Sequence, residues 1–464
     1  MQIQIKEKLD CIAAIATPLG NSGIGIIRIS GADSLVLIDR IASCRGKILS
    51  EVPSHTIHYG WIIDGQSKQP IDEVLISVMR APHTFTGDDT VEINCHGGSL
   101  ITHRVLEEVL RAGAVPAEPG EFSKCAFLNG KMDLSKAEAI IDMIEAKNRL
   151  SMDNAIHQIR GAIKEQVHEL RSNLLYEIAY IESVLDDPEH LQFIDRVEEF
   201  EAKLGFIEKT LADIVTKSEQ GKMIKEGIRT AIIGKTNVGK STLLNTLLGE
   251  ERAIVTDIAG TTRDSIEESI RLGEIHLKLV DTAGIRETED VVEKIGIKRS
   301  YSQIEEADLI LYMLDVTREL DEDDLRLMEQ LKGKNCIILL NKADSRTDFD
   351  TTPIKERLSH SIFAISARDQ IGLEQLTEEI NRLFHLDRLG IEDEIYITNL
   401  RQKLLFEKAL QSVRMVRQSF EAGMPEDFYT IDLMAAYLAL GEIIGETIGD
   451  DVVDEIFSKF CTGK

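Results

Sequence analysis

The chain has 464 residues, of which 43% are hydrophobic and 29% charged, and its 80 acidic side chains outnumber the 53 basic ones to give a formal net charge of -27. This composition excludes a fibrous or disordered chain, and the length exceeds what one hydrophobic core serves, so we expect several domains. The negative charge repels phosphate backbones, so a nucleic-acid role would require a local basic site or a basic partner.

Cysteine usage and the absence of long apolar runs indicate the cellular compartment. The six cysteines are far apart and form no C-x-x-C pair, which argues against a disulfide framework or a zinc site. The opening MQIQIKEKLD is charged, unlike a signal peptide, and no apolar run approaches the roughly 18 residues of a membrane span. We therefore expect a soluble, cytoplasmic protein with reduced thiols and no membrane partner.

The first half of the chain divides into two regions of different pattern. Residues 1–129 alternate short β-like runs, such as IGIIRIS and EVLISVM, with turns that carry glycine and proline, and they predict an α+β domain. Residues 130–220 are helical in pattern, because apolar side chains recur at spacings of three and four along one long segment. The predicted buried face of this helix consists of Leu170, Leu174, Ile178, Ile181 and Leu185.

The second half contains an α/β region followed by a return to helix. Residues 221–387 alternate buried strands, including TAIIG, LILYMLDV and CIILLNK, with helices, and they predict a parallel-sheet α/β domain. Residues 388–464 are helical again, and the predicted buried face of one helix consists of Leu433, Tyr437, Leu440 and Ile444. The predicted fold class is therefore multidomain α/β and α, in which the α/β domain is inserted into a discontinuous helical domain.

The stretch GKTNVGKS, from Gly234 to Ser241, fits the pattern G-x-x-x-x-G-K-S and stands between the predicted strand TAIIG and the predicted helix STLLNTLLG. Its glycines let backbone N–H groups approach phosphates, and the helix N-terminus adds positive potential. Lys240 can reach the β- and γ-phosphates, and Ser241 can supply an oxygen to Mg²⁺. The stretch predicts a P-loop nucleotide site.

Three further motifs follow in order: DTAG (Asp281 to Gly284), NKAD (Asn341 to Asp344) and SAR (Ser366 to Arg368). The carboxylate of Asp344 can accept two hydrogen bonds from guanine, through N1–H and the exocyclic amine, whereas adenine offers no such pair. The motifs therefore predict GTP as the nucleotide and resemble those of translation-factor-type GTPases with a Ras-like domain.

Two residues depart from the Ras-like pattern. Ile285 follows DTAG where a Ras-like enzyme carries a glutamine that orients the attacking water, so another group must do this. Asn237, inside the phosphate loop, has an amide oxygen that could ligate a cation, but it could equally be a turn residue that stabilises the loop. The residues alone leave both interpretations open.

The segment TDIAGTTRD, from Thr256 to Asp264, completes a resemblance that extends over the whole chain. With it, the sequence resembles the MnmE (TrmE) family of tRNA modification GTPases, in which a potassium ion stands where other GTPases place an arginine finger. Such a cation offsets charge on the leaving oxygens, a task for which arginine fingers contribute roughly 10³ to 10⁵ in rate. The implied potassium ligands are Asn237, Thr256, Ile258 and Thr261.

The resemblance also implies magnesium and water-positioning residues. Thr262 would join Ser241 on Mg²⁺, and Glu293, in VVEKIG, would orient the hydrolytic water through a second water. Without the resemblance, Glu293 would be interpreted as a solvated charge on a helix. The residues expected to contact GTP are Asn237, Val238, Gly239, Lys240, Ser241, Thr242, Thr256, Asp257, Ile258, Ala259, Gly260, Thr261, Thr262, Asp281, Thr282, Ala283, Gly284, Asn341, Lys342, Asp344, Ser366, Ala367 and Arg368.

The first domain shares the resemblance through GIGIIRISG, FTGDDTVEINCHGG and PGEFSKCAFLNGKMDL. It implies a folate-binding-like domain that dimerises and binds 5-formyl-tetrahydrofolate near the dimer contact, with Arg28, Glu92, Lys131 and the terminal Lys464 at the site. The glutamate tail of folate suits Arg and Lys, and the N–H groups of its pterin suit a carboxylate. Without the resemblance, each of these residues would be interpreted as a member of a surface ion pair.

The family resemblance implies an activity and a set of partners. The protein would form a homodimer and, in a heterotetramer with the flavin-dependent protein MnmG, add an aminomethyl or carboxymethylaminomethyl group to C5 of the wobble uridine of certain tRNAs. GTP hydrolysis would time this reaction, because the GTPase domains would meet across the dimer only with GTP and potassium bound. Since the chain is acidic, we expect the partner to supply most of the surface that binds tRNA.

Two alternatives stay open. A ribosome-assembly GTPase would share the nucleotide motifs, but it predicts an appended basic RNA-binding module, and none is visible in this acidic chain. A regulatory switch, whose folate-like domain is a fold without a ligand, is the other alternative. A regulatory switch of this kind would not bind formyl-tetrahydrofolate, whereas an enzyme of the MnmE type would.

The chain ends in FCTGK, after a segment with an apolar helical face. That face can dock the tail and carry Cys461 toward the first domain, where we expect it to be catalytic. A thiol at this position would act as a nucleophile or redox group only if nearby positive charge lowers its pKa, and Lys464 is the local candidate. The apolar face consists of Val453, Ile456, Phe457 and Phe460.

Overall fold

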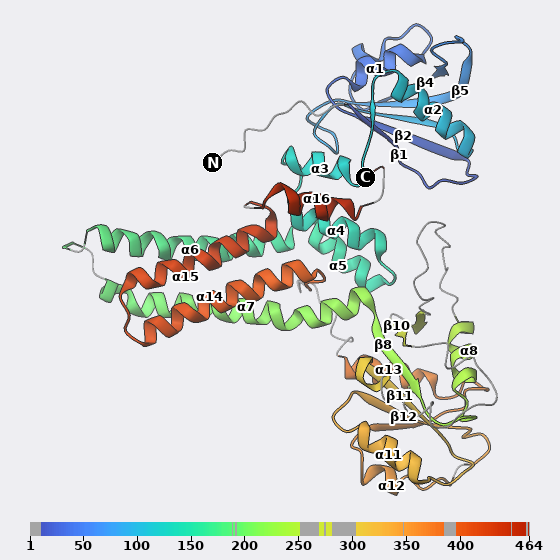
Figure 1. The fold of residues 1–464 in the computed structure, drawn as a ribbon, viewed down its shortest axis with the longest axis vertical. Coiled ribbons are helices and arrows are strands. Elements are labelled where there is room, and N and C mark those ends of the chain that lie inside the picture. Colours follow the sequence, from blue (N-terminus) through green and yellow to red (C-terminus); the bar gives the residue numbers. More distant parts are fainter. Residues whose placement is uncertain are drawn as a thin grey trace. The chain divides into compact units, whose positions relative to one another are not determined.

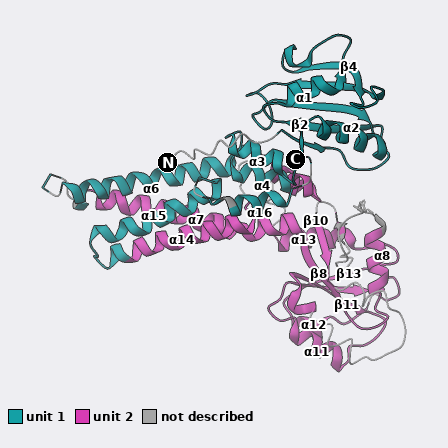
Figure 2. Ribbon diagram, turned by 45° about the horizontal axis from the view of Figure 1, so that its top comes forward, with its two compact units in different colours: residues 1–141, 158–193, 419–464 teal, residues 142–157, 194–418 magenta. Residues whose placement is uncertain are grey.

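The computed structural model describes residues 11–187, 189–190, 193–250, 269–272, 275–280, 303–346, 348–384, 396–446, 448–460 and 463. The chain divides into two compact units, which are described separately (Figure 2). The first unit comprises Met1–Ile141, Gln158–Phe193 and Ser419–Lys464, and the second comprises Asp142–His157 and Ile194–Gln418. The domain boundaries expected after residues 129, 220 and 387 stay a prediction.

The first unit contains a seven-stranded sheet (Figure 1). Its strands are β1 (Ile12–Ile15), β2 (Ile24–Ser30), β3 (Ala42–Ser43), β4 (Thr56–Ile63), β5 (Pro70–Met79), β6 (Thr90–His96) and β7 (Val115–Pro116). They lie in the order β3-β4-β5-β6-β2-β1-β7, and only β1 and β7 are parallel neighbours. The predicted strand IGIIRIS is β2 in full, and EVLISVM lies within β5, so both predictions are confirmed.

Side chains alternate between the two faces of this sheet. Ile27, Ile76 and Ile93 point into a core that also contains side chains of the neighbouring helices. Those helices are α1 (Ser34–Ile41) and α2 (Ser99–Arg111), with the short 3-10 helix η1 (Leu49–Glu51) beside α1. The opposite face therefore carries the residues in between, among them Arg28 on β2 and Glu92 on β6.

The last helix of the chain packs against helices that follow the first sheet. The further helices of the first unit are α3 (Glu121–Leu128), the first part of α4 (Leu134–Glu145), α6 (Ala162–Asp186), α15 (Glu426–Ile444) and α16 (Asp450–Ser458). The predicted apolar face at the end of the chain is confirmed, because its four side chains are buried in one cluster with α3 and α4. This cluster consists of Ala126, Met132, Leu134, Ala137, Val453, Ile456, Phe457 and Phe460.

A buried cation lies between α6 and α15. Arg171 of α6 is 7% exposed, its guanidinium carbon lies 4.2 Å from the ring centroid of Tyr437, and it forms an ion pair with Glu446. A Cβ atom at position 441 would lie 3.3 Å from this guanidinium, so Gly441 gives the side chain its room. The pairing offsets the cost of removing a charge from water.

The predicted buried faces of these two helices are confirmed except at one end. Leu433, Leu440 and Ile444 of α15 are buried, and Tyr437 is half-buried beneath Arg171. Four of the five predicted residues of α6 are buried, but Leu185 is 46% exposed, so the prediction was wrong there. Leu185 lies in the last turn of the helix, and apolar spacing alone does not show where a packed face ends.

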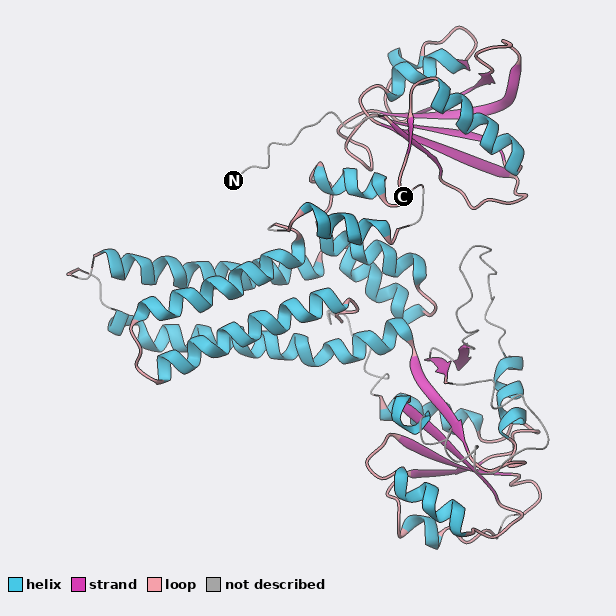
Figure 3. Cartoon of the chain, viewed as in Figure 1, coloured by secondary structure: helices cyan, strands magenta, loops and turns pink. Residues whose placement is uncertain are grey.

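The second unit contains a six-stranded sheet, in a region where strands and helices alternate along the chain (Figure 3). Its strands are β8 (Ile228–Ile233), β9 (Ser269–Leu272), β10 (Ile275–Leu279), β11 (Leu309–Asp315), β12 (Cys336–Asn341) and β13 (Ser361–Ala364). They lie in the order β13-β12-β11-β8-β10-β9, and every pair is parallel except β9 and β10. The neighbouring helices are α8 (Lys240–Glu250), α11 (Glu322–Gln330), α12 (Thr352–Lys355) and α13 (Leu373–Leu383).

Helices cover both faces of this second sheet. Along β11, Leu311 and Met313 lie in a core shared with α8 and α13, whereas Ile310 and Tyr312 lie in a second core shared with α11 and α12. Strands buried on both faces are typical of parallel sheets covered by helices, so the predicted α/β fold is confirmed. Ligands of such sheets bind at the carboxyl ends of the strands, and the predicted phosphate loop, NKAD and SAR lie at the ends of β8, β12 and β13.

The second unit also contains long helices. They are the second part of α4, α5 (Arg149–Ile159), α7 (Val197–Glu226) after the 3-10 helix η2 (Phe193–Arg196), and α14 (Leu400–Glu421). Glu208 of α7 accepts hydrogen bonds from Arg414 and Arg417 of α14, at 3.3 and 2.6 Å. None of the helices in the described part of the chain is both long and apolar enough to span a membrane.

Residues 142–157, here called the junction segment, hold the end of α7 just before the chain enters the second sheet. The carboxylate of Asp142 accepts a hydrogen bond from Lys225 Nζ at 2.6 Å. The side-chain Nδ2 of Asn148 donates to the backbone oxygen of Ile224 at 3.1 Å. Asp142 and Asn148 are both buried, so these bonds form in a region of low dielectric, where they are strong.

The junction segment also holds the chain where it leaves the second sheet. Asn154 forms a pair of hydrogen bonds with the backbone of Tyr396, donating to its oxygen at 3.1 Å and accepting from its nitrogen at 3.4 Å. Asp142 accepts a second hydrogen bond, from Thr398 Oγ1, at 2.5 Å. Both crossings of the chain, before β8 and after α13, are therefore bonded to the same short segment.

Candidate functional site

The predicted phosphate loop connects β8 to α8, and three of its residues have positive φ angles: Gly234 (147°), Asn237 (62°) and Gly239 (103°). Position 239 requires glycine, because a Cβ atom there would lie 2.2 Å from the side-chain nitrogen of Asn341. Asparagine is one of the few other residue types that tolerate the left-handed region. A turn-forming backbone at Asn237 is compatible with a ligand role for its side chain.

Asn341, the first residue of NKAD, joins the phosphate loop to the SAR segment. Its Nδ2 donates to the backbone oxygen of Val238 at 2.7 Å, and its Oδ1 accepts from the backbone nitrogen of Ala367 at 3.0 Å. Thr246 of α8 adds a third link by donating to the backbone oxygen of Ala367 at 2.7 Å. The structure thus brings together three motifs that are far apart in the sequence. Thr246 was not expected at the site, because no motif contains it.

Lys342 is held by a carboxylate that the motifs did not identify. Its Nζ donates to Asp315 Oδ2 at 2.5 Å, and its backbone has a φ of 65°. Asp315 ends β11, and its other oxygen accepts from the backbone nitrogen and hydroxyl of Thr317 at 2.9 and 2.6 Å. Although burial opposes it, these bonds from Lys342 and Thr317 lower the pKa of Asp315. Asp315 is therefore ionised at neutral pH and fixes the lysine.

The residues predicted to recognise the base lie at the loops after β12 and β13. Asp344 is exposed, and hydrogen bonds from Ser345 and then Ser366 lower the pKa of its carboxyl group, which keeps it an acceptor at neutral pH. The hydroxyl oxygen of Ser366 also lies 2.9 Å from Asp369 Oδ2 and accepts a hydrogen bond from the backbone nitrogen of Asp369 at 3.3 Å, which stabilises the turn that carries Arg368. Arg368 itself is exposed.

Lys240 bonds to the loop that carries it. Its Nζ donates to the backbone oxygens of Gly234 and Lys235 at 2.6 and 2.7 Å. Burial lowers the pKa of this ammonium group to about 8, because a charge is less stable away from water. Ser241 and Thr242 follow it in the first turn of α8.

The first sheet brings together two of the residues that the resemblance implied for a folate site. Arg28 and Glu92 are directly opposite each other on β2 and β6, and Arg28 Nε donates to Glu92 Oε1 at 2.9 Å. Arg28 Nη1 also donates to the backbone oxygen of Gly463 at 3.1 Å. The ring centroids of Phe85 and Phe122 lie 5.9 and 5.7 Å from the guanidinium carbon. A charged pair, two aromatic rings and Gly463 therefore meet at one place.

Lys131 lies beside the loop that contributes one of these rings. Its Nζ donates to the backbone oxygen of Pro82 at 2.8 Å, and a Cβ at Gly87 would lie 3.3 Å from its Cγ. The same loop is joined to β2, because the hydroxyls of Ser30 and Thr86 are 2.7 Å apart. Within the described part of the chain, Lys131 bonds to Pro82 and not to Arg28 or Glu92.

Several predicted site residues lie outside the described residues. They are Thr256, Asp257, Ile258, Ala259, Gly260, Thr261, Thr262, Asp281, Thr282, Ala283, Gly284, Glu293, Cys461 and Lys464. Their roles stay predictions.

Comparisons with known proteins cover almost the whole chain. The family model described as the MnmE helical domain matches residues 134–461, and the one described as the N-terminus of the GTP-binding protein TrmE matches residues 11–131. The tRNA modification GTPase MnmE of Lachnoclostridium phytofermentans is 49% identical over 462 residues, which are 98% of this chain and 100% of that protein. The protein of the same name from Enterococcus faecalis is 46% identical, over 98% and 99%. Among solved structures, the FeoB G-domain from Methanococcus jannaschii is 28% identical, covers 34% of this chain and 98% of its own, and gives a TM-score of 0.26.

Nucleotide affinity is expected to fall as the pH rises through about 8, the pKa of Lys240 in the free protein. A bound phosphate favours the ammonium form and so raises this pKa, which means that binding takes up a proton above pH 8. The Kd for GDP should therefore rise by up to roughly tenfold per pH unit above about pH 8 and stay level below about pH 7. Fluorescence titration with a labelled GDP measures this dependence.

The Lys240→Arg variant is the matched control, because its guanidinium stays charged throughout this range. Its affinity is expected to be weaker but level across the same pH values, apart from any change that comes from the base itself. An equal rise of Kd in both proteins would show that Lys240 is not the titrating group.

Proposed function

This chain belongs to the MnmE family of tRNA modification GTPases, and from that premise we propose that it adds an aminomethyl or carboxymethylaminomethyl group to C5 of the wobble uridine of certain tRNAs. It does so with the flavin-dependent partner MnmG, and the carbon comes from formyl-tetrahydrofolate. The observation that carries this proposal is the hydrogen bond from Arg28 to the backbone oxygen of Gly463. It attaches the C-terminal tail to the side chain that would bind the folate.

The residues around Arg28 fit a folate. The side chains of Arg28 and Glu92 are 23% and 24% exposed, so they are accessible to a ligand. A guanidinium suits the carboxylates of a glutamate tail, a carboxylate suits the N–H edge of a pterin, and aromatic rings such as Phe85 and Phe122 suit a flat heterocycle. Lys131 and Lys464 would add positive charge. When bound, the folate would supply the one-carbon unit.

We propose Cys461 as the nucleophile at this site. It stands two residues before Gly463 in the sequence, and two residues of extended chain span about 7 Å at most. The other cysteines are poor candidates, because burial raises the pKa of each, to about 11 for Cys95 and about 12 for Cys125, and thiolates are the reactive form. The five described thiols with a raised pKa are Cys11, Cys44, Cys95, Cys125 and Cys336.

The variant Cys461→Ser is expected to abolish tRNA modification and to keep the GTPase rate within about twofold, because a hydroxyl is a far weaker nucleophile than a thiolate. Mass analysis of tRNA nucleosides, after reaction with the reconstituted partner and formyl-tetrahydrofolate, measures the modification. Iodoacetamide at neutral pH should label Cys461 first in the native protein. Normal modification by the variant would rule out a catalytic thiol.

Omission of the partner is the control in the same assay. Because the chain carries a net charge of -27, we propose that tRNA binds mainly through the partner, so tRNA retention should be lost without it. If this chain alone retains tRNA as well as the complex does, that division of roles is wrong.

For GTP hydrolysis, we propose that a potassium ion beside the phosphates offsets the charge that develops in the transition state. Asn237 fits a ligand role, because its left-handed backbone holds it within the exposed part of the phosphate loop. Ser241, the second residue of α8, would hold Mg²⁺ together with Thr262. Glu293 would orient the attacking water.

GTP hydrolysis is expected to be faster in potassium than in sodium at equal ionic strength, by roughly 10-fold or more given the rates attributed to such charges. The Asn237→Gly variant should lose this difference, because glycine keeps the positive φ and removes the amide oxygen. Its Kd for GDP should change little. Equal rates of the native protein in the two salts would contradict the proposed cation site.

We also propose a homodimer formed through the open face of the first sheet. Ile57, Tyr59, Trp61 and Leu75 are 68%, 40%, 39% and 48% exposed on that face of β4 and β5. Tyr59 and Leu75 are direct cross-strand partners. An exposed apolar patch of this kind typically marks a protein contact. The patch lies on the same face as Glu92, which is paired with Ser77 of β5, so the folate site would be close to the dimer contact.

The Leu75→Glu variant is expected to weaken the dimer by about 30-fold or more, the equivalent of ~2 kcal/mol, because a charge would be buried in the contact. Sedimentation measures the dimer. Trp61 is the single tryptophan of the chain, so its emission should shift to the red as the protein dissociates. Leu100→Glu, a change at a 73% exposed residue of α2, should leave the dimer intact. Native-like dimers of the Leu75 variant would exclude this face.

A further inference from the structure

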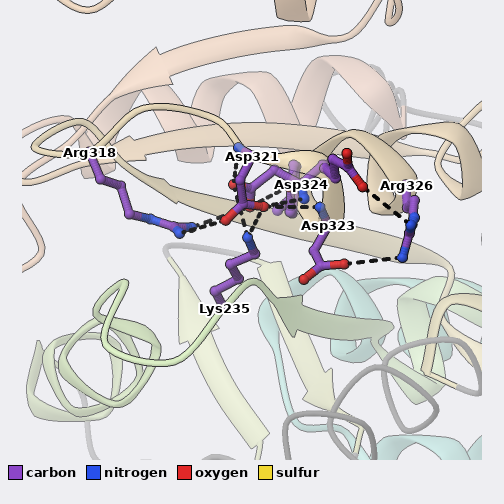
Figure 4. A network of polar contacts seen from close by, with 8 residues as sticks. Lys235, Arg318, Asp321, Asp323, Asp324 and Arg326 are labelled. Carbon is purple, nitrogen blue, oxygen red and sulfur yellow. Dashed lines mark hydrogen bonds and ion pairs between the residues drawn. The ribbon is translucent and has the colours of Figure 1, made fainter.

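Lys235, the second residue of the phosphate loop, contacts the start of α11 (Figure 4). Its Nζ bonds to Asp321 and lies 3.3 Å from Asp324 Oδ2. The lysine side chain is 19% exposed, so most of it is removed from water. The sequence motifs gave no role to this residue.

The two carboxylates that receive Lys235 are fixed to the main chain of α11. Asp321 is the N-cap residue, and its Oδ1 accepts from the backbone nitrogens of Asp323 and Asp324 at 2.9 and 3.3 Å. Asp324 in turn accepts from the backbone nitrogen of Asp321 at 3.2 Å, which completes a capping box. Lys235 is therefore bonded to a rigid group and not to two free side chains.

Asp324 needs positive charge, because its side chain is only 1% exposed. A buried carboxylate is costly unless it is paired. Arg318 supplies one partner, with Nη2 3.2 Å from Asp324 Oδ1, and Lys235 supplies the other. The hydrogen bond from Lys235 is also the main reason that the pKa of Asp321 is lowered. Asp321 is thus ionised at neutral pH and attracts the lysine.

The main chain of Lys235 contacts Lys240, the second lysine of the phosphate loop. Its backbone oxygen accepts a hydrogen bond from Lys240 Nζ at 2.7 Å, next to the bond from Lys240 to Gly234. One residue therefore links α11, through its side chain, to the lysine of the phosphate site, through its carbonyl. Movement of Lys235 would move the backbone that surrounds the phosphates.

We propose that Lys235 is a positioning residue of the nucleotide site, which holds the main chain of the phosphate loop against α11 in the shape that receives the phosphates. Preorganisation of this kind lowers the cost of binding. Once a nucleotide is bound, the phosphates themselves order the loop, so the tether affects affinity far more than turnover. This role concerns nucleotide binding alone and is independent of the tRNA chemistry proposed above.

The variant Lys235→Ala of the full chain tests this role. We expect the Kd for GDP, measured with Mg²⁺ by calorimetry, to rise about tenfold, which is within the range of one hydrogen bond to a charged group. The KM for GTP should rise in parallel, and kcat at saturation should stay within about twofold. Lys235→Arg should restore most of the affinity, since its longer side chain can reach the same carboxylates.

Two substitutions in the first turn of α11 form a matched pair. Asp321→Asn keeps a residue that caps helices well but removes the charge that attracts Lys235, so it should raise the Kd several-fold. Its effect should not add to that of Lys235→Ala in the double variant. Asp323→Asn is the control, because its carboxylate lies 3.5 Å from Arg326 and is not bonded to Lys235 (Figure 4). It should leave the Kd unchanged.

Three results would overturn the proposal. The first is an unchanged Kd in Lys235→Ala, whatever happens to its melting temperature, since lowered stability alone would mean a purely structural ion pair. The second is a loss of kcat at constant Kd, which would place the residue in the chemical step. The third is an equal rise of Kd in the Asp321 and Asp323 variants, which would mean that α11 responds to any lost charge.

Discussion

The buried side chain of Asn341 is the interaction on which the nucleotide site depends. Its amide is paired on both sides with backbone groups of other loops, Val238 and Ala367. Each of these groups would cost roughly 1 to 3 kcal/mol if it were left buried without a partner. The same side chain occupies the space that a Cβ at Gly239 would need. Asn341 therefore constrains both the phosphate loop and the SAR segment, and Thr246 adds a further bond to the latter.

The lysines of the site are held in two different ways. Lys342 and Lys235 are bonded to carboxylates, Asp315 for the first and Asp321 with Asp324 for the second. Lys240 is bonded only to neutral carbonyls in the contacts that the described residues provide. A lysine that is paired with a carboxylate already has a strong, charged acceptor. In the part of the chain that the structure describes, Lys240 has only neutral acceptors, so its hydrogen bonds would become stronger if a phosphate replaced the two carbonyls. Among the described residues, no carboxylate therefore compensates the charge of Lys240, the lysine predicted to reach the phosphates.

Much of the fold was predictable from local patterns, and the remainder depended on contacts between distant residues. The strands and the apolar face of α16 could be predicted, because buried residues recur along the sequence with the period of a strand or a helix. Leu185 was wrongly placed, because where a packed face ends depends on the neighbouring helix. The phosphate loop and Asn341 belong to motifs that a linear pattern contains. Asp315 and Thr246 belong to no motif, and only the parallel pairing of the strands and the packing of α8 bring them to the site.

In the candidate folate site, too, the contacts between distant residues could not be predicted from local sequence patterns. Nothing in the spacing of Arg28 and Glu92 indicates that they are paired, since 64 residues separate them, and the resemblance alone suggested both. Their contact follows from the register of β2 and β6, which is fixed by the core on the other face of the sheet. The hydrogen bond from Arg28 to Gly463 joins residues 435 positions apart, so no local sequence pattern could predict it.

The junction segment has a consequence for the order of events during synthesis. Its hydrogen bonds reach 242 residues along the chain to Tyr396 and 256 residues to Thr398. During synthesis, the hydrogen bonds of Asn154 to Tyr396 and of Asp142 to Thr398 cannot form until those two residues have left the ribosome. The strands from β8 to β13, whose partners are closer in sequence, emerge in the meantime and can form their sheet first. The second sheet is therefore able to form before the junction segment makes its last hydrogen bonds.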